Sequence, residues 1–186
     1  VSYLAITWDG LLKDLQPLLD YRKSRGELVD VLTVDDIYNA FSYGYKDYDA
    51  LRLAMRHALI NRGAPRLRSV LMVGEASEYW WELSKPNTSN ALIDRVPAYG
   101  WRNPDVGIRG DDSYTHLIGD GPWSDIEIGR LSVNTGEELR EITNRIIAYE
   151  TARPGGGWLG RHLFVSDDEP EFSTVAEKII QTDLGL

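Results

Sequence analysis

The pattern of hydrophobic and polar positions predicts alternating strands and helices over residues 1–73. Three short runs have the composition of β-strands, and the third is almost wholly apolar: Ser2–Thr7, Glu27–Thr33 and Ser69–Val73. Between them, apolar residues recur at helical spacing from Leu11 to Arg22 and from Asp49 to Arg62. This β-α-β order implies right-handed crossovers. We therefore expect an α/β fold, with an open, mainly parallel sheet and helices on both faces.

Three local signals refine this first part of the chain. Trp8-Asp9-Gly10 is a turn signal after the first strand, and Gly26 is placed to end the helix that follows. Val34–Tyr43 has room for a short helix, with Asp35 or Asp36 near its start.

A long irregular segment, Gly74 to Asp125, precedes the next predicted strand. It carries scattered proline and glycine and these aromatic residues: Tyr79, Trp80, Trp81, Trp101 and Trp123. So long a connection in a compact domain usually has a function. The alternative is a surface excursion whose aromatic side chains pack over the edge of the sheet.

The regular pattern returns at a fourth strand, Asp125–Val133. Thr135 is then placed to cap a helix that extends to Glu150, with Glu137 and Glu138 in its first turn. Further on, we expect a fifth strand at Arg161–Ser166. The apolar residues from Phe172 to Ile180 recur at helical spacing and predict a closing helix.

The domain organisation follows from a stretch rich in proline and glycine, residues 151–157. We expect a first α/β subdomain at 1–150, a linker at 151–157 and a strand–helix unit at 158–186. One strand and one helix cannot bury both of their faces alone. The predicted strand Arg161–Ser166 is therefore expected to lie parallel at or beyond the edge of the main sheet, with one flank unpaired or covered by another chain.

Composition and motifs exclude several classes of protein. The formal net charge of −9 argues against a nucleic-acid binder. No apolar run is long enough to cross a bilayer, and the residues from Val1 onward do not have the pattern of a signal peptide. The chain has no cysteine, which removes disulfides, thiolate zinc sites and a cysteine nucleophile from these residues. Glycine signatures of dinucleotide sites, P-loops and serine-hydrolase elbows are also absent from the sequence.

Candidate chemistry is limited to three histidines and three acidic clusters. His57 fits a helix surface, His162 opens a predicted strand, and His116 lies in the irregular segment. The first acidic cluster contains Asp111, Asp112 and Asp120, with Asp125 nearby, and carboxylates interleaved with glycine can bind calcium. The other two clusters are Asp35-Asp36, at a helix start, and Asp167-Asp168-Glu169, after the fifth strand. Capping and solvated turns are the alternative interpretation of all three.

A set of motifs in a fixed order resembles the gingipain family of cysteine peptidases, the C25 class with a caspase-like fold. The motifs are LQPLLDYRKSRG, VDDIYNAFSYG, LRSVLMVGEAS, DDSYTHL, DIEIGRLSV, ELREITNRIIAYE and WLGRHLFVSDDE. The IGRLSV strand, followed by a helix that ends in IIAYE, is the most specific part. Glu75 stands in VLMVGE where the family usually has aspartate.

The resemblance implies a catalytic domain of two α/β subdomains, with the catalytic histidine in a Gly-His-Gly turn and the cysteine after a later strand. Both belong to the second subdomain, and neither motif is present in residues 1–186. The resemblance implies that residues 1–150 are the first subdomain of this catalytic domain and that residues 158–186 are the first strand–helix unit of the second, with the remainder absent. An acidic residue after the first strand of that subdomain helps to line the specificity pocket. Asp167, Asp168, Glu169 and Glu171 occupy the comparable stretch. Members of the family also bind calcium. The resemblance further implies a secreted or cell-surface location.

The leading hypothesis is the amino-terminal part of a gingipain-like cysteine endopeptidase, with its Cys/His dyad in a downstream segment. This chain alone is then expected to be inactive, and its partners are the catalytic segment and a peptide or protein substrate. One alternative is a non-catalytic interaction module that binds through its tryptophan-bearing loop. Another is a flavodoxin-like small-molecule binder, which rests on fold analogy.

Overall fold

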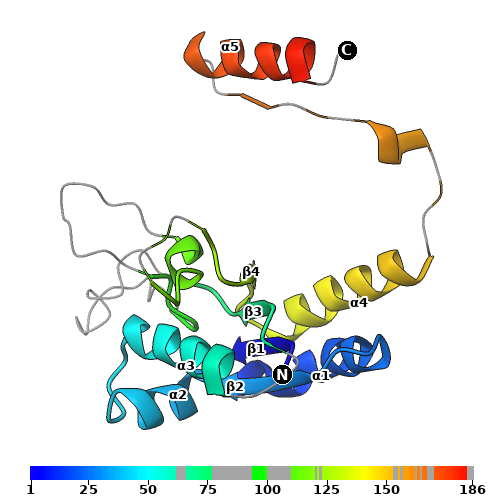
Figure 1. Cartoon of the computed structure of the whole chain (residues 1–186). Helices are drawn as coiled ribbons and strands as arrows, with labels where there is room; N and C mark the ends of the chain where they lie inside the picture. The colour runs from blue at the N-terminus through cyan, green and yellow to red at the C-terminus, as the bar shows by residue number, and fades with distance from the viewer. Residues whose placement is uncertain are drawn as a thin grey trace, which may run out of the picture. The chain divides into compact units, whose positions relative to one another are not determined.

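The computed structural model confirms the α/β class (Figure 1). It describes residues 1–61, 66–76, 94–99, 110–119, 121, 123–152, 155, 157–161, 163, 165–166 and 170–183. These residues form two compact units, Val1–Tyr149 and Glu150–Leu186. Of the helices among them, none is long and apolar enough to cross a membrane.

A parallel sheet with the strand order β2-β1-β3-β4 forms the centre of the first unit. Its strands are β1 (Tyr3–Thr7), β2 (Val29–Thr33), β3 (Ser69–Val73) and β4 (Glu127–Leu131). The register pairs Thr7 with both Thr33 and Val73, and Val73 with Leu131. All residues of β1 are buried, as expected for a central strand covered on both faces.

Two helices cover each face of this sheet. On one face, α1 (Asp9–Ser24) and α4 (Gly136–Ala152) pack leucine and isoleucine side chains against Ala5 and Val73. On the other, α2 (Val34–Phe41) and α3 (Tyr48–Asn61) pack against Leu4, Ile6 and Met72. Each helix buries mainly its apolar stripe, so the helical periodicity of the sequence largely determines which residues are buried.

Capping residues mark where three of the helices begin or end. Thr33 accepts a hydrogen bond from the backbone N–H of Asp36 at the start of α2. Thr135 and Glu138 each accept a hydrogen bond from the other's backbone N–H at the start of α4, which is a capping box. Gly26, with φ of +90°, follows α1 in the left-handed region that glycine tolerates. The Trp8-Asp9-Gly10 turn prediction is wrong, since α1 begins directly at Asp9.

The second unit contains short helical elements and is described by itself. A 3₁₀ turn, η3 (Gly157–Gly160), precedes α5 (Pro170–Lys178), which continues into a π-helical turn, η4 (Ile179–Asp183). The predicted fifth strand is not formed by the described residues of its range: Arg161, Leu163, Val165 and Ser166. A strand requires a hydrogen-bonded neighbour, and a run of apolar residues alone does not provide one. The assignment of this unit to a second subdomain stays a prediction.

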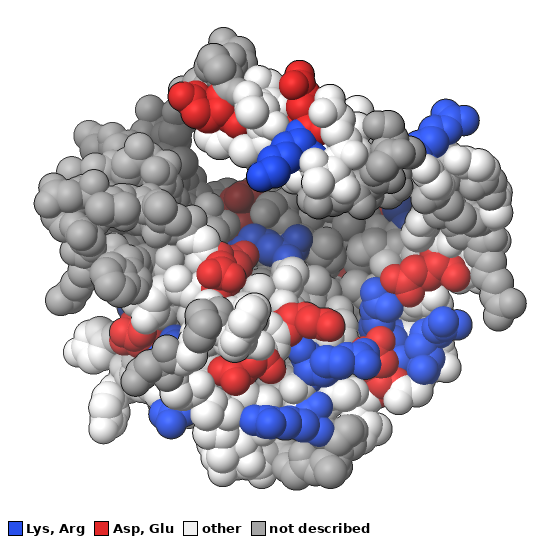
Figure 2. Space-filling model, turned by 45° about the horizontal axis from the view of Figure 1, so that its top comes forward, with Lys and Arg blue, Asp and Glu red and all other residues white. Residues whose placement is uncertain are grey.

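Acidic and basic side chains lie interspersed on the face shown in Figure 2. The described residues of this face form no continuous basic surface.

Candidate functional site

The candidate site lies at the carboxyl ends of β1 and β3, where the strand order of the sheet reverses. In open α/β sheets, ligands bind in the crevice outside such a reversal point. Here the buried Thr7 hydroxyl donates a hydrogen bond of 3.0 Å to the carbonyl oxygen of Val73, which ties the two strand ends together. Trp8 and Gly74 are the next residues along the two strands.

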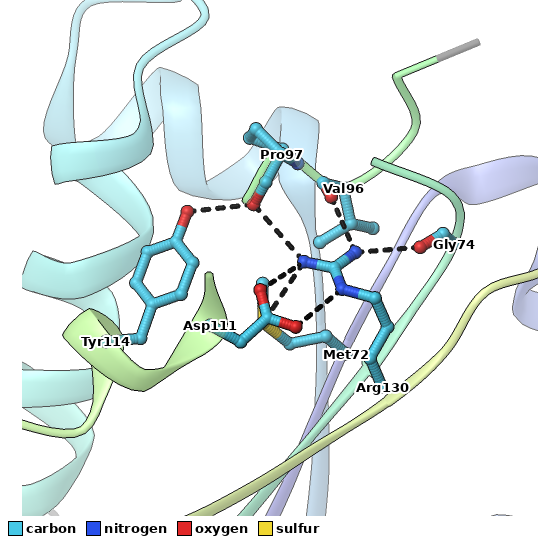
Figure 3. Close-up of polar contacts among 7 residues, drawn as sticks. All are labelled: Met72, Gly74, Val96, Pro97, Asp111, Tyr114 and Arg130. Carbon is cyan, nitrogen blue, oxygen red and sulfur yellow. Dashed lines mark hydrogen bonds and ion pairs between the residues drawn. The ribbon is translucent and has the colours of Figure 1, made fainter. Parts of the chain in front are cut away.

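Arg130, on the edge strand β4, is the centre of the polar contacts at this end of the sheet (Figure 3). Its Nε and Nη2 atoms each lie 2.7 Å from one carboxylate oxygen of Asp111. Its Nη1 atom donates to the carbonyl oxygens of Gly74 and Val96, at 2.8 and 2.7 Å, and Nη2 also lies 3.4 Å from the carbonyl oxygen of Pro97. The donors of the guanidinium are therefore all used within the protein.

These contacts fix the segment 94–99 on the sheet. The backbone N–H groups of Arg95 and Val96 both donate to the carbonyl oxygen of Glu75, at 2.8 and 3.1 Å. The buried Tyr114 hydroxyl donates to the carbonyl oxygen of Pro97 at 2.9 Å (Figure 3). Burial raises the pKa of Tyr114 well above its ordinary value, so the group remains a neutral donor.

A second tyrosine secures the far end of the same segment. Tyr99 donates to Asp49 at 2.9 Å and packs edge-on against Tyr48 and Tyr114. Burial, and then the hydrogen bond to Asp49, raises the pKa of Tyr99 to about 12. Segment 94–99 is thus attached to Glu75, which follows β3, and to β4, η2 (Asp111–Tyr114) and α3.

Arg95 extends from this fixed segment over Trp8. The guanidinium carbon lies 3.7 Å from the centroid of the Trp8 ring, a close cation–π contact. Two glycines make room for the pair. A Cβ at Gly10 would lie 2.1 Å from the nearest Trp8 ring carbon, and a Cβ at Gly74 would lie 2.9 Å from the Arg95 Cβ.

The carboxylates proposed for calcium do not form a cluster in the described part of the chain. Both oxygens of Asp111 accept from Arg130, and Asp112 is exposed. Asp120 lies outside the described residues. Among the residues that the structure describes, no group of three histidine or acidic side chains is placed to hold a metal. Calcium binding by this segment stays a prediction.

Asp125 acts as a loop cap. Its carboxylate accepts hydrogen bonds of 2.8 Å from the backbone N–H groups of Leu117 and Ile118. These bonds hold the pKa of Asp125 below its usual value. The capping interpretation therefore accounts for this residue.

The substrate-pocket candidates are only partly placed. Asp167, Asp168 and Glu169 lie outside the described residues, and Glu171 is exposed in the first turn of α5. Their role stays a prediction.

The histidines and the aromatic residues of the irregular segment are only partly described. His57 is exposed on α3, and His116 is half-buried with its Nδ1 atom 3.4 Å from the Thr115 hydroxyl. His162, Tyr79, Trp80, Trp81 and Trp101 lie outside the described residues, whereas Trp123 is described and exposed.

Sequence reasoning missed Arg95 and the role of Arg130. Arg130 lies in the IGRLSV motif, so the motif was a usable signal. Arg95 has no local signal, because its partner Trp8 is far away along the chain.

Comparison with known proteins provides the family. The model of peptidase family C25 matches residues 1–184. A search of curated proteins finds no match. Among solved structures, dimeric latent PorU from Porphyromonas gingivalis is similar with a TM-score of 0.67 and 21% identity, over 95% of this chain and 18% of that one.

Two further solved structures agree with this result. The Arg-specific cysteine proteinase gingipain R (RgpB) is similar with a TM-score of 0.59 and 22% identity, over 80% of this chain and 28% of that one. The complex of the pro- and mature domains of RgpB from Porphyromonas gingivalis has a TM-score of 0.59 and 21% identity, over 80% of this chain and 29% of that one. The chain thus spans less than a third of each of these three proteins, whose likeness shows the fold. The match over residues 1–184 shows the family: this chain belongs to peptidase family C25.

Proposed function

We propose that this chain is the part of a C25-type cysteine endopeptidase that does not carry the nucleophile. Peptide-bond hydrolysis would then use a Cys/His dyad on a polypeptide segment outside residues 1–186. The observation that carries the proposal is the family match over residues 1–184 of a sequence with no cysteine. Acyl transfer requires an activated nucleophile, a base within hydrogen-bond reach and donors for the oxyanion. This chain lacks the first of these requirements.

The apolar surface of the second unit supports a partner segment. Phe172, Val175 and Ile179 recur at helical spacing on α5 and η4, with 53%, 57% and 37% of each residue exposed. Leu163 and Val165 are 88% and 85% exposed. Burying a large aliphatic or aromatic side chain contributes about 1.5–3 kcal/mol. A surface of this kind is typical of an interaction site, and we propose the catalytic segment as its partner.

Two measurements test this proposal. The purified chain, assayed with arginine and lysine peptides in the presence of reductant and calcium, should cleave none of them. Reproducible cleavage that co-purifies with the intact chain would contradict the proposal. The coding sequence on both sides of residues 1–186 should also specify a cysteine after a strand pattern and a Gly-His-Gly turn.

A non-catalytic interaction module is the second candidate. Trp123 favours it, because 83% of this residue is exposed, and tryptophan is enriched at protein interfaces. If the natural gene encodes neither a catalytic cysteine nor a Gly-His-Gly turn, the interaction module is favoured over the peptidase proposal.

A further inference from the structure

The strongest unexplained feature of the first unit is the Arg95 guanidinium. The guanidinium carbon of Arg95 lies over the ring of Trp8. A guanidinium that stacks on an aromatic ring uses one of its faces, and the N–H groups at its edge can still donate hydrogen bonds. Its Nε atom is buried and has no hydrogen-bond acceptor. Among the described residues, no carboxylate forms an ion pair with Arg95. A buried donor without an acceptor is unfavourable, so an acceptor at this place would stabilise the site.

The surroundings of Arg95 hold it in place. Its backbone N–H is bonded to Glu75, and the carbonyl oxygens of the two residues that follow it are bonded to Arg130. Gly10 and Gly74 provide the space that the stacked pair occupies, and Gly74 has φ of +143°. A long side chain that is fixed before binding loses little entropy when a ligand arrives.

Position and charge indicate the class of ligand. The pair lies where β1 and β3 end beside each other, outside the reversal point of the sheet. A stacked guanidinium offers parallel N–H donors that match the two oxygens of a carboxylate. Arg95 supplies the single positive charge of this contact, and the acidic residue Asp9 begins the adjacent helix α1. Because this setting combines one positive charge with a nearby negative one, the site is better suited to a singly charged anion than to a phosphate dianion.

We propose that Arg95, stacked on Trp8 at the reversal point of the sheet, is a binding site for a carboxylate group. The carboxylate comes from an acidic peptide side chain or from a free carboxylic acid. This site is separate from the catalytic chemistry proposed above, which is assigned to residues outside this chain. Its test therefore succeeds or fails independently of peptidase activity.

The test is a titration of the full ¹⁵N-labelled chain, followed at the Nε–H signal of Arg95 and the indole N–H signal of Trp8. The probes are acetyl-Gly-Glu-Gly amide, its glutamine counterpart, sodium acetate and inorganic phosphate. The glutamate peptide should shift both signals saturably and bind at least about tenfold more tightly than the glutamine peptide. Saturation by acetate at similar concentrations identifies a free carboxylate as sufficient, whereas saturation by the glutamate peptide alone identifies a peptide side chain.

Variants separate binding from folding. Arg95→Gln should abolish the shift of the Trp8 signal, and Arg95→Lys, which keeps the charge without the planar donors, should weaken binding at least about tenfold. Arg145→Gln, a change at an exposed arginine on α4, is the control and should bind like the original chain. Unchanged amide signals from β1 and β3 verify the fold of each variant. Equal binding of the two peptides, saturation by phosphate at lower concentration than by carboxylates, or no saturable shift with any probe would overturn the proposal.

Discussion

Arg130 and Asp111 form a two-point ion pair that attaches the edge strand β4 to the turn η2. The side chains are 12% and 21% exposed, so the pair is largely removed from water. The same guanidinium binds carbonyl oxygens of Gly74 and Val96, which belong to two other segments. One side chain thus determines the arrangement of the backbone at the carboxyl end of the sheet.

Replacing Arg130 by methionine should lower the free energy of unfolding by roughly 2–4 kcal/mol, because the Asp111 carboxylate and two carbonyl oxygens lose their donors. Urea denaturation measures this loss. Arg145→Met is the matched control: its pair with Glu141 is exposed on both sides, and its loss should cost at most about 0.5 kcal/mol. Equal losses for the two variants would show that the Arg130 contacts contribute no more than surface charges do.

Gly74→Ala should destabilise the chain by roughly 1–3 kcal/mol. Gly74 has φ of +143°, and an added Cβ would lie 2.9 Å from both the Arg95 Cβ and the Val96 Cγ2. Gly129→Ala, in the adjacent strand, is the control, because a Cβ there meets nothing within 4 Å. The melting temperatures of the two variants test this prediction. Equal melting temperatures for Gly74→Ala and Gly129→Ala would contradict it.

The sequence predicted the strands and helices of the first unit because their apolar periodicity is local. It also located the cap at Thr135, because a cap and the first helical turn are adjacent in the sequence; the reciprocal hydrogen bond from Thr135 to Glu138 became evident only in the structure. The contacts of Arg130 with Val96 and of Arg95 with Trp8 could not be predicted in this way, because only the folded sheet brings these residues together. The strand predicted at Arg161–Ser166 is not formed by the described residues of that range, for a related reason: the apolar run that includes Leu163 and Val165 is local, but strand pairing depends on a neighbour that no local pattern specifies.

Asp125 gives the chain a pH-dependent contribution to stability. The backbone hydrogen bonds from Ile118 and Leu117 lower its pKa in the folded state. The contribution is therefore fully present above the unfolded pKa of about 4 and is lost as the pH falls through the lower folded value. Asp125→Asn should be less stable than the original chain at neutral pH, and the gap should narrow below about pH 4. A gap that stays constant down to strongly acidic pH, in urea denaturation at a series of pH values, would contradict this assignment.

Calcium binding by Asp111, Asp112 or Asp120 predicts a melting temperature that rises with calcium concentration, since a ligand that binds the folded state stabilises it. Magnesium at the same ionic strength is the control. The Arg130 contacts occupy both oxygens of Asp111, so we expect Asp112→Asn or Asp120→Asn to reduce the shift. If millimolar calcium leaves the melting curve unchanged, these carboxylates are ordinary turn residues.

Hydrogen exchange should separate the segment around Leu163 from the central sheet. The amides of Val70 and Met72 lie in a strand with neighbours on both sides, so their exchange requires opening of the sheet. Leu163 and Val165 are exposed and lie outside any strand, so their amides should exchange much faster, at rates close to those of an unprotected chain. Adding the polypeptide that carries the proposed catalytic dyad should slow exchange at Leu163 and Val165 while leaving Val70 and Met72 unchanged. Near-global protection of Leu163 and Val165 in the isolated monomer would show that this segment already has its partner, and the argument for a catalytic segment packed on the second unit would be wrong.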